Sequence, residues 1–221
     1  MNNKSTIILL LTLLMLIEGI ANAQKYVDLG LPSGTLWADR NVGASSSEDY
    51  GDYFSWGETT TKSDYSWSTY KYYNNGGDEK LTKYCSESAC GNNGYTDTLT
   101  TLERSDDAAI ANWGSDWRTP TPQQFQELKD YCTWTWATRN GKNGYEVKGK
   151  NGNSIFLPAA GYRDGTSLYR VGSCGSYWSS ALVADSPDNG CSLNFHSGRV
   201  NPDRWSCRWY GFSVRPVRCR N

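Results

Sequence analysis

The chain has 221 residues, of which 38% are hydrophobic and 14% aromatic, and its formal net charge at pH 7 is −1. This length is enough to bury a sizeable core, and the near-zero charge argues against a protein that binds nucleic acid through a strongly basic surface. The charges are nevertheless uneven, since residues 28–116 carry fifteen acidic and six basic side chains and residues 117–221 carry seven and fourteen. Two explanations fit this asymmetry: a surface that binds nucleic acid, or two halves of one fold that pack together with complementary electrostatic fields. The arginines are scattered along the chain and not grouped in a block, which favours the second explanation. We therefore expect no nucleic-acid partner.

The first 23 residues have the layout of a secretory signal. Lys4 supplies a positive charge, Ile7–Ile17 is an apolar run, and small residues precede Gln24. A membrane-spanning helix needs about 20 apolar residues, so this run is too short to remain as an anchor. We predict a signal peptide over residues 1–23, cleaved near Ala23-Gln24. The mature protein, a single domain over residues 24–221, is then secreted or held at the cell surface, with no membrane insertion after signal removal.

The first half of the mature chain predicts short strands and one short helix. Strands are expected at Tyr26–Leu29 and Thr35–Ala38, on either side of a Pro-Ser-Gly turn. Residues 61–101 are rich in Tyr, Asn, Gly and Thr without sustained periodicity, which predicts a loop-rich surface excursion. After it, Ser105 is expected to cap a short helix that runs through Asn112, with Gly114 as its stop.

A stronger helix signal begins at Thr121. Pro122 occupies the first helical position, and Gln124 stands where a reciprocal capping box requires it. Phe125 and Leu128 then fall on one face, which predicts a helix packed against the core.

The second half predicts several antiparallel strands. Asn140-Gly141 and Asn143-Gly144 are expected turns between extended segments, and Ser197-Gly198 is expected to close a hairpin into Arg199. The further strands expected from apolar alternation or apolar runs are Ser154–Leu157, Tyr177–Ser180, Ser192–His196 and Phe212–Val217. Small residues at Pro158–Gly161 predict a close approach of two backbones.

Seven cysteines suit an exported protein in which disulfides persist, and an odd number leaves at least one without an intrachain partner. Cys85–Cys90 is the first expected pair and Cys191–Cys207 the second. A zinc site is the alternative, but the sequence has no C-x-x-C pair and only one histidine, His196, near a cysteine.

Several segments together resemble the Fibrobacter succinogenes major paralogous domain, a family of exported bacterial proteins. The segments that carry the resemblance are YVDLGLPSGTLWA at 26–38, EDYGDYFSWGET at 48–59, WRTPTPQQFQEL at 117–128, NGNSIFLPAAGYRDGTSLY at 151–169, GSYWSS at 175–180 and GFSVRPVR at 211–218. Their order is also similar to the formylglycine-generating branch of C-type-lectin-like folds. The resemblance implies an α+β, C-type-lectin-like single domain with short twisted antiparallel sheets, two helices and long loops. It also implies that Tyr26–Leu29 lies beside Phe212–Val217 and that residues 182–209 face the ligand.

Little in the sequence points to catalysis. His196 is the only histidine, so no histidine-based triad or multi-histidine metal site can form, and alternation predicts that it faces solvent. Asn201-Pro202-Asp203 is similar to the sugar-binding motif of calcium-dependent lectins, but a plain turn is the preferred interpretation. We expect no enzyme activity, no catalytic or metal-binding residues and no cofactor, with calcium as the one alternative.

The remaining candidate site is residues 182–209, which lack a clear core-building pattern. Trp and Arg are enriched at binding hot spots, although Trp205 and Trp209 also suit a core, while Arg215 and Arg218 are assigned to structure. The candidate ligand-binding residues are Asp188, Asn189, Ser192, Asn194, His196, Arg199, Asp203, Arg204, Trp205, Ser206, Arg208 and Trp209. These residues predict a binding or adhesion module for a surface protein or a glycan. The alternatives are a structural subunit of a cell-surface assembly and a variable target protein of a diversity-generating retroelement.

Overall fold

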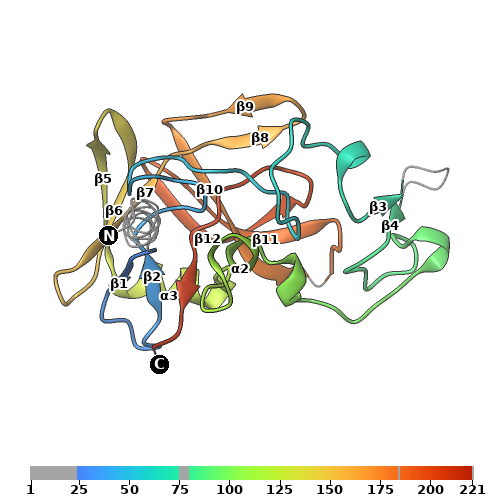
Figure 1. The fold of residues 1–221 in the computed structure, drawn as a ribbon, viewed down its shortest axis with the longest axis horizontal. Helices are drawn as coiled ribbons and strands as arrows, with labels where there is room; N and C mark the ends of the chain where they lie inside the picture. Colours follow the sequence, from blue (N-terminus) through green and yellow to red (C-terminus); the bar gives the residue numbers. More distant parts are fainter. Residues whose placement is uncertain (1–23, 75–79, 184, 221) are drawn as a thin grey trace, which may run out of the picture.

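A computed structural model describes residues 24–74, 80–183 and 185–220. The predicted signal peptide, residues 1–23, lies outside the described residues. The described chain is mixed: small antiparallel sheets are joined by long loops and accompanied by two α-helices (Figure 1). The predicted α+β class is confirmed at this level. Within these ranges no helix combines the length and apolar character needed to cross a membrane.

The two ends of the domain meet in one sheet. It consists of β1 (Tyr26–Asp28), β2 (Leu36–Ala38) and β13 (Val217–Arg218), in the order β1-β2-β13. The expectation that the first strand lies beside the last is therefore wrong in detail, because β2 lies between them. Of the predicted strand Phe212–Val217, only Val217 lies in β13. Phe212 and Ser213 form isolated bridges to two different segments, and Pro216 has no N–H to donate.

The two helices share a polar junction. Helix α3 (Pro122–Tyr131) has the predicted capping box: Gln124 N donates to Thr121 Oγ1 at 3.2 Å and Thr121 N donates to Gln124 Oε1 at 3.0 Å. Helix α2 (Ala108–Trp113) ends at Gly114 as predicted, but Asp107, not Ser105, caps it. The Asp107 carboxylate accepts from the start of α2 and from Thr119 N at 2.9 Å, so it also fixes the approach to α3. Ser105 lies in the preceding 3₁₀ turn, η3 (Arg104–Asp106).

The second sheet contains β5 (Thr133–Arg139), β6 (Lys142–Lys148) and β7 (Ser154–Pro158). The predicted Asn140-Gly141 turn is confirmed, with φ of 47° and 77°, the left-handed conformations of a tight hairpin. The predicted Asn143-Gly144 turn is wrong, because both residues lie within β6. Gly144 instead allows close strand packing, since a Cβ there would lie 2.3 Å from Leu157 O.

The third sheet is formed by β10 (Cys174–Leu182), β11 (Asn189–His196) and β12 (Arg199–Cys207). The predicted Ser197-Gly198 hairpin joins β11 to β12. Leu193 and Phe195 are fully buried and pack with Phe125 and Leu128 of α3. The expectation that residues 182–209 lack core-building residues is therefore wrong: one face of this sheet completes the core and the other carries polar side chains.

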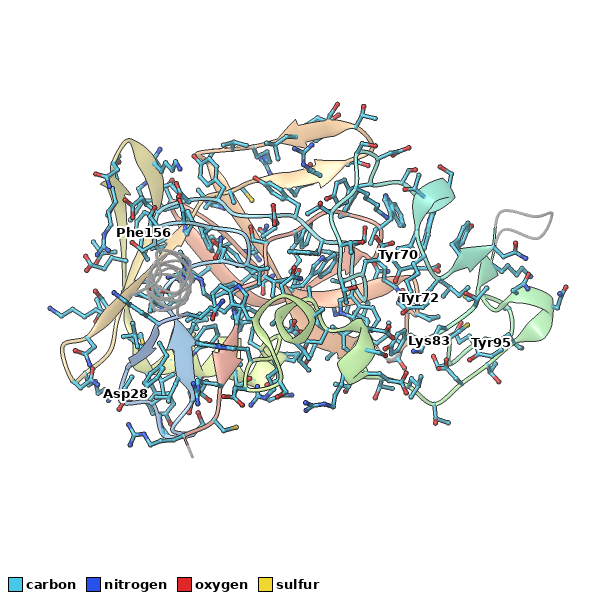
Figure 2. All side chains as sticks on the ribbon, viewed as in Figure 1. Asp28, Tyr70, Tyr72, Lys83, Tyr95 and Phe156 are labelled. Carbon is cyan, nitrogen blue, oxygen red and sulfur yellow. The ribbon has the colours of Figure 1, made fainter. Side chains whose placement is uncertain are left out.

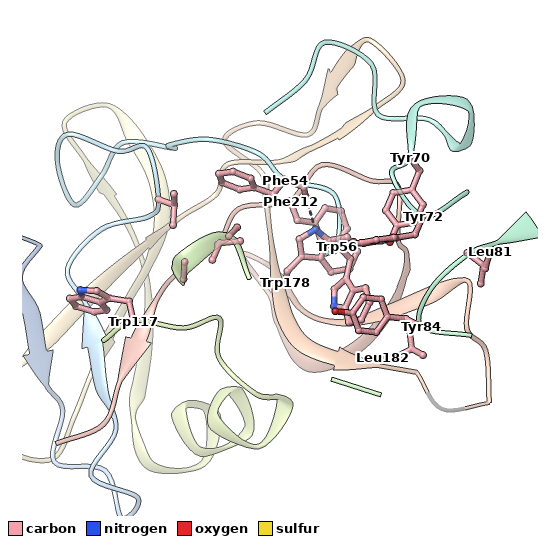
Figure 3. Close-up of a cluster of buried hydrophobic side chains, with 14 of the residues drawn as sticks. Phe54, Trp56, Tyr70, Tyr72, Leu81, Tyr84, Trp117, Trp178, Leu182 and Phe212 are labelled. Carbon is pink, nitrogen blue, oxygen red and sulfur yellow. Dashed lines mark hydrogen bonds between the residues drawn. The ribbon is translucent and has the colours of Figure 1, made fainter. Parts of the chain in front are cut away.

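Residues 61–101, here called the arm, contain η1 (Trp67–Thr69), β3 (Tyr73–Asn74), β4 (Lys80–Leu81) and η2 (Asn92–Gly94). The arm is loop-rich, as predicted, and extends from one end of the domain (Figure 1). Four of its six tyrosines, Tyr65, Tyr70, Tyr72 and Tyr84, are nevertheless buried. Tyr70 and Tyr72 lie closer to the body than Tyr95 does (Figure 2), and they are buried in the same cluster as Trp56 and Trp178 (Figure 3). The arm therefore contributes core and is more than a surface excursion.

A buried carboxylate joins the arm to the body. Asp106 is 3% exposed and accepts hydrogen bonds from Lys83 Nζ at 2.6 Å, Tyr84 OH at 2.7 Å and Lys71 Nζ at 3.2 Å. Burial alone raises the pKa of this carboxyl group, but the bonds from Lys83, Tyr84 and Lys71 outweigh it and hold the pKa below its ordinary value of 3.8.

Acid should weaken this junction. A carboxyl group whose pKa is lowered on folding stabilises the native state above its unfolded pKa, and this contribution disappears as the pH falls through the folded value. We expect Asp106→Asn to lower the free energy of unfolding at pH 7 by about 1–3 kcal/mol. We also expect the variant to lose less stability than the parent between pH 5 and pH 2, measured by urea unfolding. Equal acid losses in the two proteins would contradict this role.

All seven cysteines are free thiols in the structure, so neither predicted disulfide is formed. The strand register explains why the second predicted disulfide, Cys191–Cys207, does not form. Cys207 lies opposite Asn189, and Cys191 lies opposite Trp205. The two cysteines are diagonal neighbours, farther apart than directly opposed residues and outside the usual geometry of a disulfide. In the first pair, the Cys85 thiol lies 3.1 Å from Glu87 O.

Candidate ligand-binding cleft

The polar face of the β10-β11-β12 sheet forms the floor of the candidate site. The register places Ser176 opposite Asn194, and Asn194 opposite Asn201 on the third strand. Cross-strand partners share a face, so these polar side chains lie together, and the next pairs extend the same face from Cys174 to His196 and Arg199. The intervening side chains, including Phe195, point into the core.

An irregularity in β12 shapes this floor. Asn194 lies opposite Asn201, whereas Ser192 lies opposite Arg204, so β12 carries one extra residue in this interval. Pro202 occupies the interval, and a bulge tolerates a residue without an N–H group. The interpretation of Asn201-Pro202-Asp203 as a plain turn is therefore wrong, because the three residues form a bulged part of a strand.

Aromatic side chains form the facing wall. Tyr162, in β8 (Tyr162–Asp164), has its ring centroid 5.6 Å from that of Tyr210 and 5.6 Å from that of Tyr169, in β9 (Ser167–Tyr169). The Tyr210 ring stacks in turn on Phe212, with centroids 6.0 Å apart. The β8-β9 hairpin lies beside β10 (Figure 1), held there by a bridge from the residue before β8, Gly161, to β10.

The close approach of two backbones predicted at Pro158–Gly161 is confirmed at Gly161. It has a φ of 69°, and a Cβ there would lie 2.0 Å from Tyr169 O. A side chain at this position would push the aromatic wall away from the floor.

Floor and wall flank a half-open cavity of about 490 Å³, within the range of pockets that hold small ligands. Its lining residues are Tyr162, Arg170, Cys174, Ser176, Asn189, Asn194, His196, Arg199, Asn201, Arg204, Trp205, Ser206, Cys207, Tyr210 and Phe212. The lining combines aromatic rings with amide, hydroxyl, imidazole and guanidinium groups. We call this cavity the cleft.

Hydrogen bonds to neighbouring groups hold the floor in place before any ligand arrives. Asn194 Nδ2 donates to Ser176 Oγ at 3.0 Å and to Gly175 O at 3.4 Å. His196 Nδ1 accepts from Gly198 N at 3.3 Å. A floor fixed in this way loses little conformational entropy when a ligand binds.

Seven of the candidate residues line the cleft. They are Asn189, Asn194, His196, Arg199, Arg204, Trp205 and Ser206. Of these, His196 is exposed, as alternation predicted, and Trp205 is 57% exposed.

Five candidate residues lie elsewhere. Ser192 is fully buried, donates to Arg204 O at 3.0 Å and lies 3.1 Å from the Ser206 hydroxyl, so it links β11 to β12 and does not reach the cleft. Asp188 is half-buried, and burial raises the pKa of its carboxyl group. Asp203 is exposed but does not line the cleft, and Trp209 is half-buried with its ring centroid 4.3 Å from that of Trp67 in the arm.

For Arg208, the fifth of these residues, the prediction was wrong. It was expected on a displayed surface, yet it is fully buried. Its guanidinium donates to Tyr70 OH at 2.9 Å and to the carbonyl oxygens of Lys83, Tyr84 and Pro187 at 2.9–3.1 Å. Arg208 therefore ties the arm to the body and cannot reach a ligand.

Sequence reasoning missed half of the lining. The residues not proposed are Tyr162, Arg170, Cys174, Ser176, Asn201, Cys207, Tyr210 and Phe212. Cys174 and Ser176 alternate along β10 and could have been found by pairing that strand with Ser192–His196. Nothing in the sequence places Tyr162 near Tyr210, since that contact depends on the tertiary fold.

Two cysteines, Cys174 and Cys207, line the cleft. Burial raises the pKa of the Cys207 thiol, which keeps it protonated and weakly nucleophilic at neutral pH. In the described ranges, no three His, Cys, Asp or Glu side chains form a group that could hold a metal ion.

No protein-family model, curated protein or solved structure matches this chain.

Proposed function

We propose that the protein is an exported, non-catalytic binding module that captures its ligand in the cleft, within a C-type-lectin-like domain. The single observation that carries the proposal is the cleft itself, a cavity of about 490 Å³ whose floor is fixed by internal hydrogen bonds. The meeting of the domain's two ends in one sheet supports the proposed fold, although β2 lies between the first strand and the last.

A glycan is the ligand class that the lining supports best. Tyr162 and Tyr210 offer flat apolar rings that can stack on the faces of a sugar, while Asn194 and Asn201 offer amides for its hydroxyl groups. An aromatic wall opposite amide groups suits a ligand that is apolar on one face and rich in hydroxyls along its edges. A surface protein is the second ligand class, to be tested in the same screen.

Trp205 supplies the test of this function. We expect Trp205→Ala to weaken ligand capture at least tenfold, because an exposed Trp beside a cleft is a typical binding hot spot. Its melting temperature should stay within about 2 °C of the parent, since little buried area is lost. The measurement is a glycan-array and surface-protein capture screen of the secreted protein, run with and without calcium.

The matched control is Tyr95→Ala, which removes another exposed aromatic ring at the end of the arm (Figure 2). Capture by Trp205→Ala equal to that by Tyr95→Ala would refute the cleft as the binding site. A stable oligomer by native mass measurement, with no ligand captured, would favour the alternative role as a subunit of a cell-surface assembly.

A further inference from the structure

We infer that the ligand of the cleft is an acidic carbohydrate, whose sugar rings carry carboxylate or sulfate groups. This inference rests on the proposed function and adds the charge of the ligand to it.

The first observation is the charge of the lining. Arg170, Arg199 and Arg204 line the cleft, and no Asp or Glu does. The chain as a whole has 23 acidic and 22 basic residues, so its composition does not require that all the charged residues of the lining be basic. A cavity lined by one sign of charge concentrates ligands of the opposite sign.

The second observation is that the three arginines have no partner of their own in the described part of the chain. Each is exposed, and none forms an ion pair or donates a side-chain hydrogen bond there. Arg139, by contrast, is paired with Glu146 at 2.8 Å, and Arg218 lies 3.7 Å from an Asp116 oxygen. A guanidinium without a partner keeps all its donors for the planar, two-oxygen groups that it binds best, carboxylate and sulfate among them.

The third observation is the spacing of the charges. Arg199 and Arg204 lie on the same strand, five residues apart, which corresponds to about 15 Å along an extended chain. The two arginines therefore leave the backbone well apart, and an oligosaccharide with an acidic group on successive rings can offer a separate group to each of them. Arg170 approaches from the turn between β9 and β10, so the cationic groups flank the cleft on more than one side.

The fourth observation is the backbone of Arg170. Its φ is 57°, a left-handed conformation that costs a non-glycine residue free energy, and its carbonyl oxygen accepts from Ser173 N at 3.1 Å and Cys174 N at 3.0 Å to fix the turn. Glycine would form this turn more easily. The backbone of this turn therefore does not favour an arginine at position 170, whereas the arginine side chain lines the cleft.

The test compares ligands that differ only in charge. An oligogalacturonate, its methyl ester, an oligosaccharide of a sulfated galactan and the desulfated counterpart are titrated into the secreted protein by isothermal titration calorimetry. We expect the acidic members to bind at least tenfold more tightly than their neutral counterparts, and to lose affinity when the salt concentration rises from 50 to 300 mM. The carboxylate and sulfate pairs separate the two sources of charge.

The variants are chosen to leave the fold intact. We expect Arg199→Gln and Arg204→Gln each to weaken binding of the acidic ligand about tenfold, the usual loss when a charge-assisted hydrogen bond is removed. Arg170→Gly should weaken it similarly with no loss of melting temperature, because glycine fits the left-handed turn. Arg104→Gln, an exposed arginine outside the cleft, is the control and should bind like the parent.

Three results overturn the inference: equal affinity for acidic and neutral members of each pair, no binding of either acidic oligosaccharide, or cleft-arginine variants that bind like Arg104→Gln. If a neutral glycan still binds and Trp205→Ala abolishes that binding, only the charge of the ligand was wrong. If ligand capture is indifferent to Trp205 as well, the proposed function fails with it.

Discussion

Replacing Arg208 with alanine is expected to lower the free energy of unfolding by about 3–5 kcal/mol. The side chain is fully buried, and its loss leaves four acceptors without their donor, on Tyr70, Lys83, Tyr84 and Pro187. It also removes a guanidinium that lies 5.1 Å from the Trp56 ring centroid and opens a cavity in its place. In a domain of this size the expected fall in melting temperature is roughly 6–20 °C.

The measurement is urea unfolding combined with limited proteolysis. Because three of the four acceptors belong to the arm, we expect new cleavage sites within residues 61–101 before the rest of the domain is digested. Arg204→Ala is the matched control, an exposed arginine of the same hairpin, and it should change stability by less than about 0.5 kcal/mol. If the two variants are equally stable, Arg208 does not tie the arm to the body.

Arg215→Ala is expected to cause a loss of similar size, about 3–5 kcal/mol. Arg215 is fully buried and donates to Asn41 Oδ1 at 2.8 Å, Ala38 O at 3.1 Å and Phe156 O at 2.8 Å. Burial lowers the pKa of its guanidinium to about 10, so the group is still charged at neutral pH and depends on these acceptors. The bonds join the end of the chain to β2 and to β7.

Hydrogen exchange distinguishes this loss from that of Arg208. We expect Arg215→Ala to increase exchange at β2 and β7, with the arm unaffected apart from the global loss of stability. Arg220→Ala, whose side chain is 61% exposed, removes a nearby charge as the control. Exchange that rises equally throughout both variants would contradict a local role for Arg215.

Local signals predicted the parts of this fold that depend on a few neighbouring residues. The capping box of α3 and the Asn140-Gly141 turn involve groups no more than three residues apart, and both are confirmed. The same reasoning failed at Asn143-Gly144, because a glycine that suits a turn also suits a strand pressed against Leu157. Composition cannot distinguish these two uses of glycine.

The cleft was only partly predictable for the same reason. Residues 189–206 supply two of the three strands of its floor and were found as a polar segment, but the alternation that buries Leu193 and Phe195 was given too little weight. Arg208 follows them by two residues and was grouped with them, although its partner Tyr70 lies 138 residues away in the sequence. The aromatic wall depends on equally distant contacts, so no local pattern could reveal it.

In the proposed complex, the ligand lies between the aromatic wall and the polar sheet face. The most direct measurement is a crystal structure of the protein soaked with the oligogalacturonate or the sulfated oligosaccharide. We predict sugar rings against Tyr162 and Tyr210, hydroxyl groups on Asn194 or Asn201, and an acidic group on Arg204. A ligand bound instead in the separate cavity beside Arg118 and Arg218, with the cleft empty, would contradict the account.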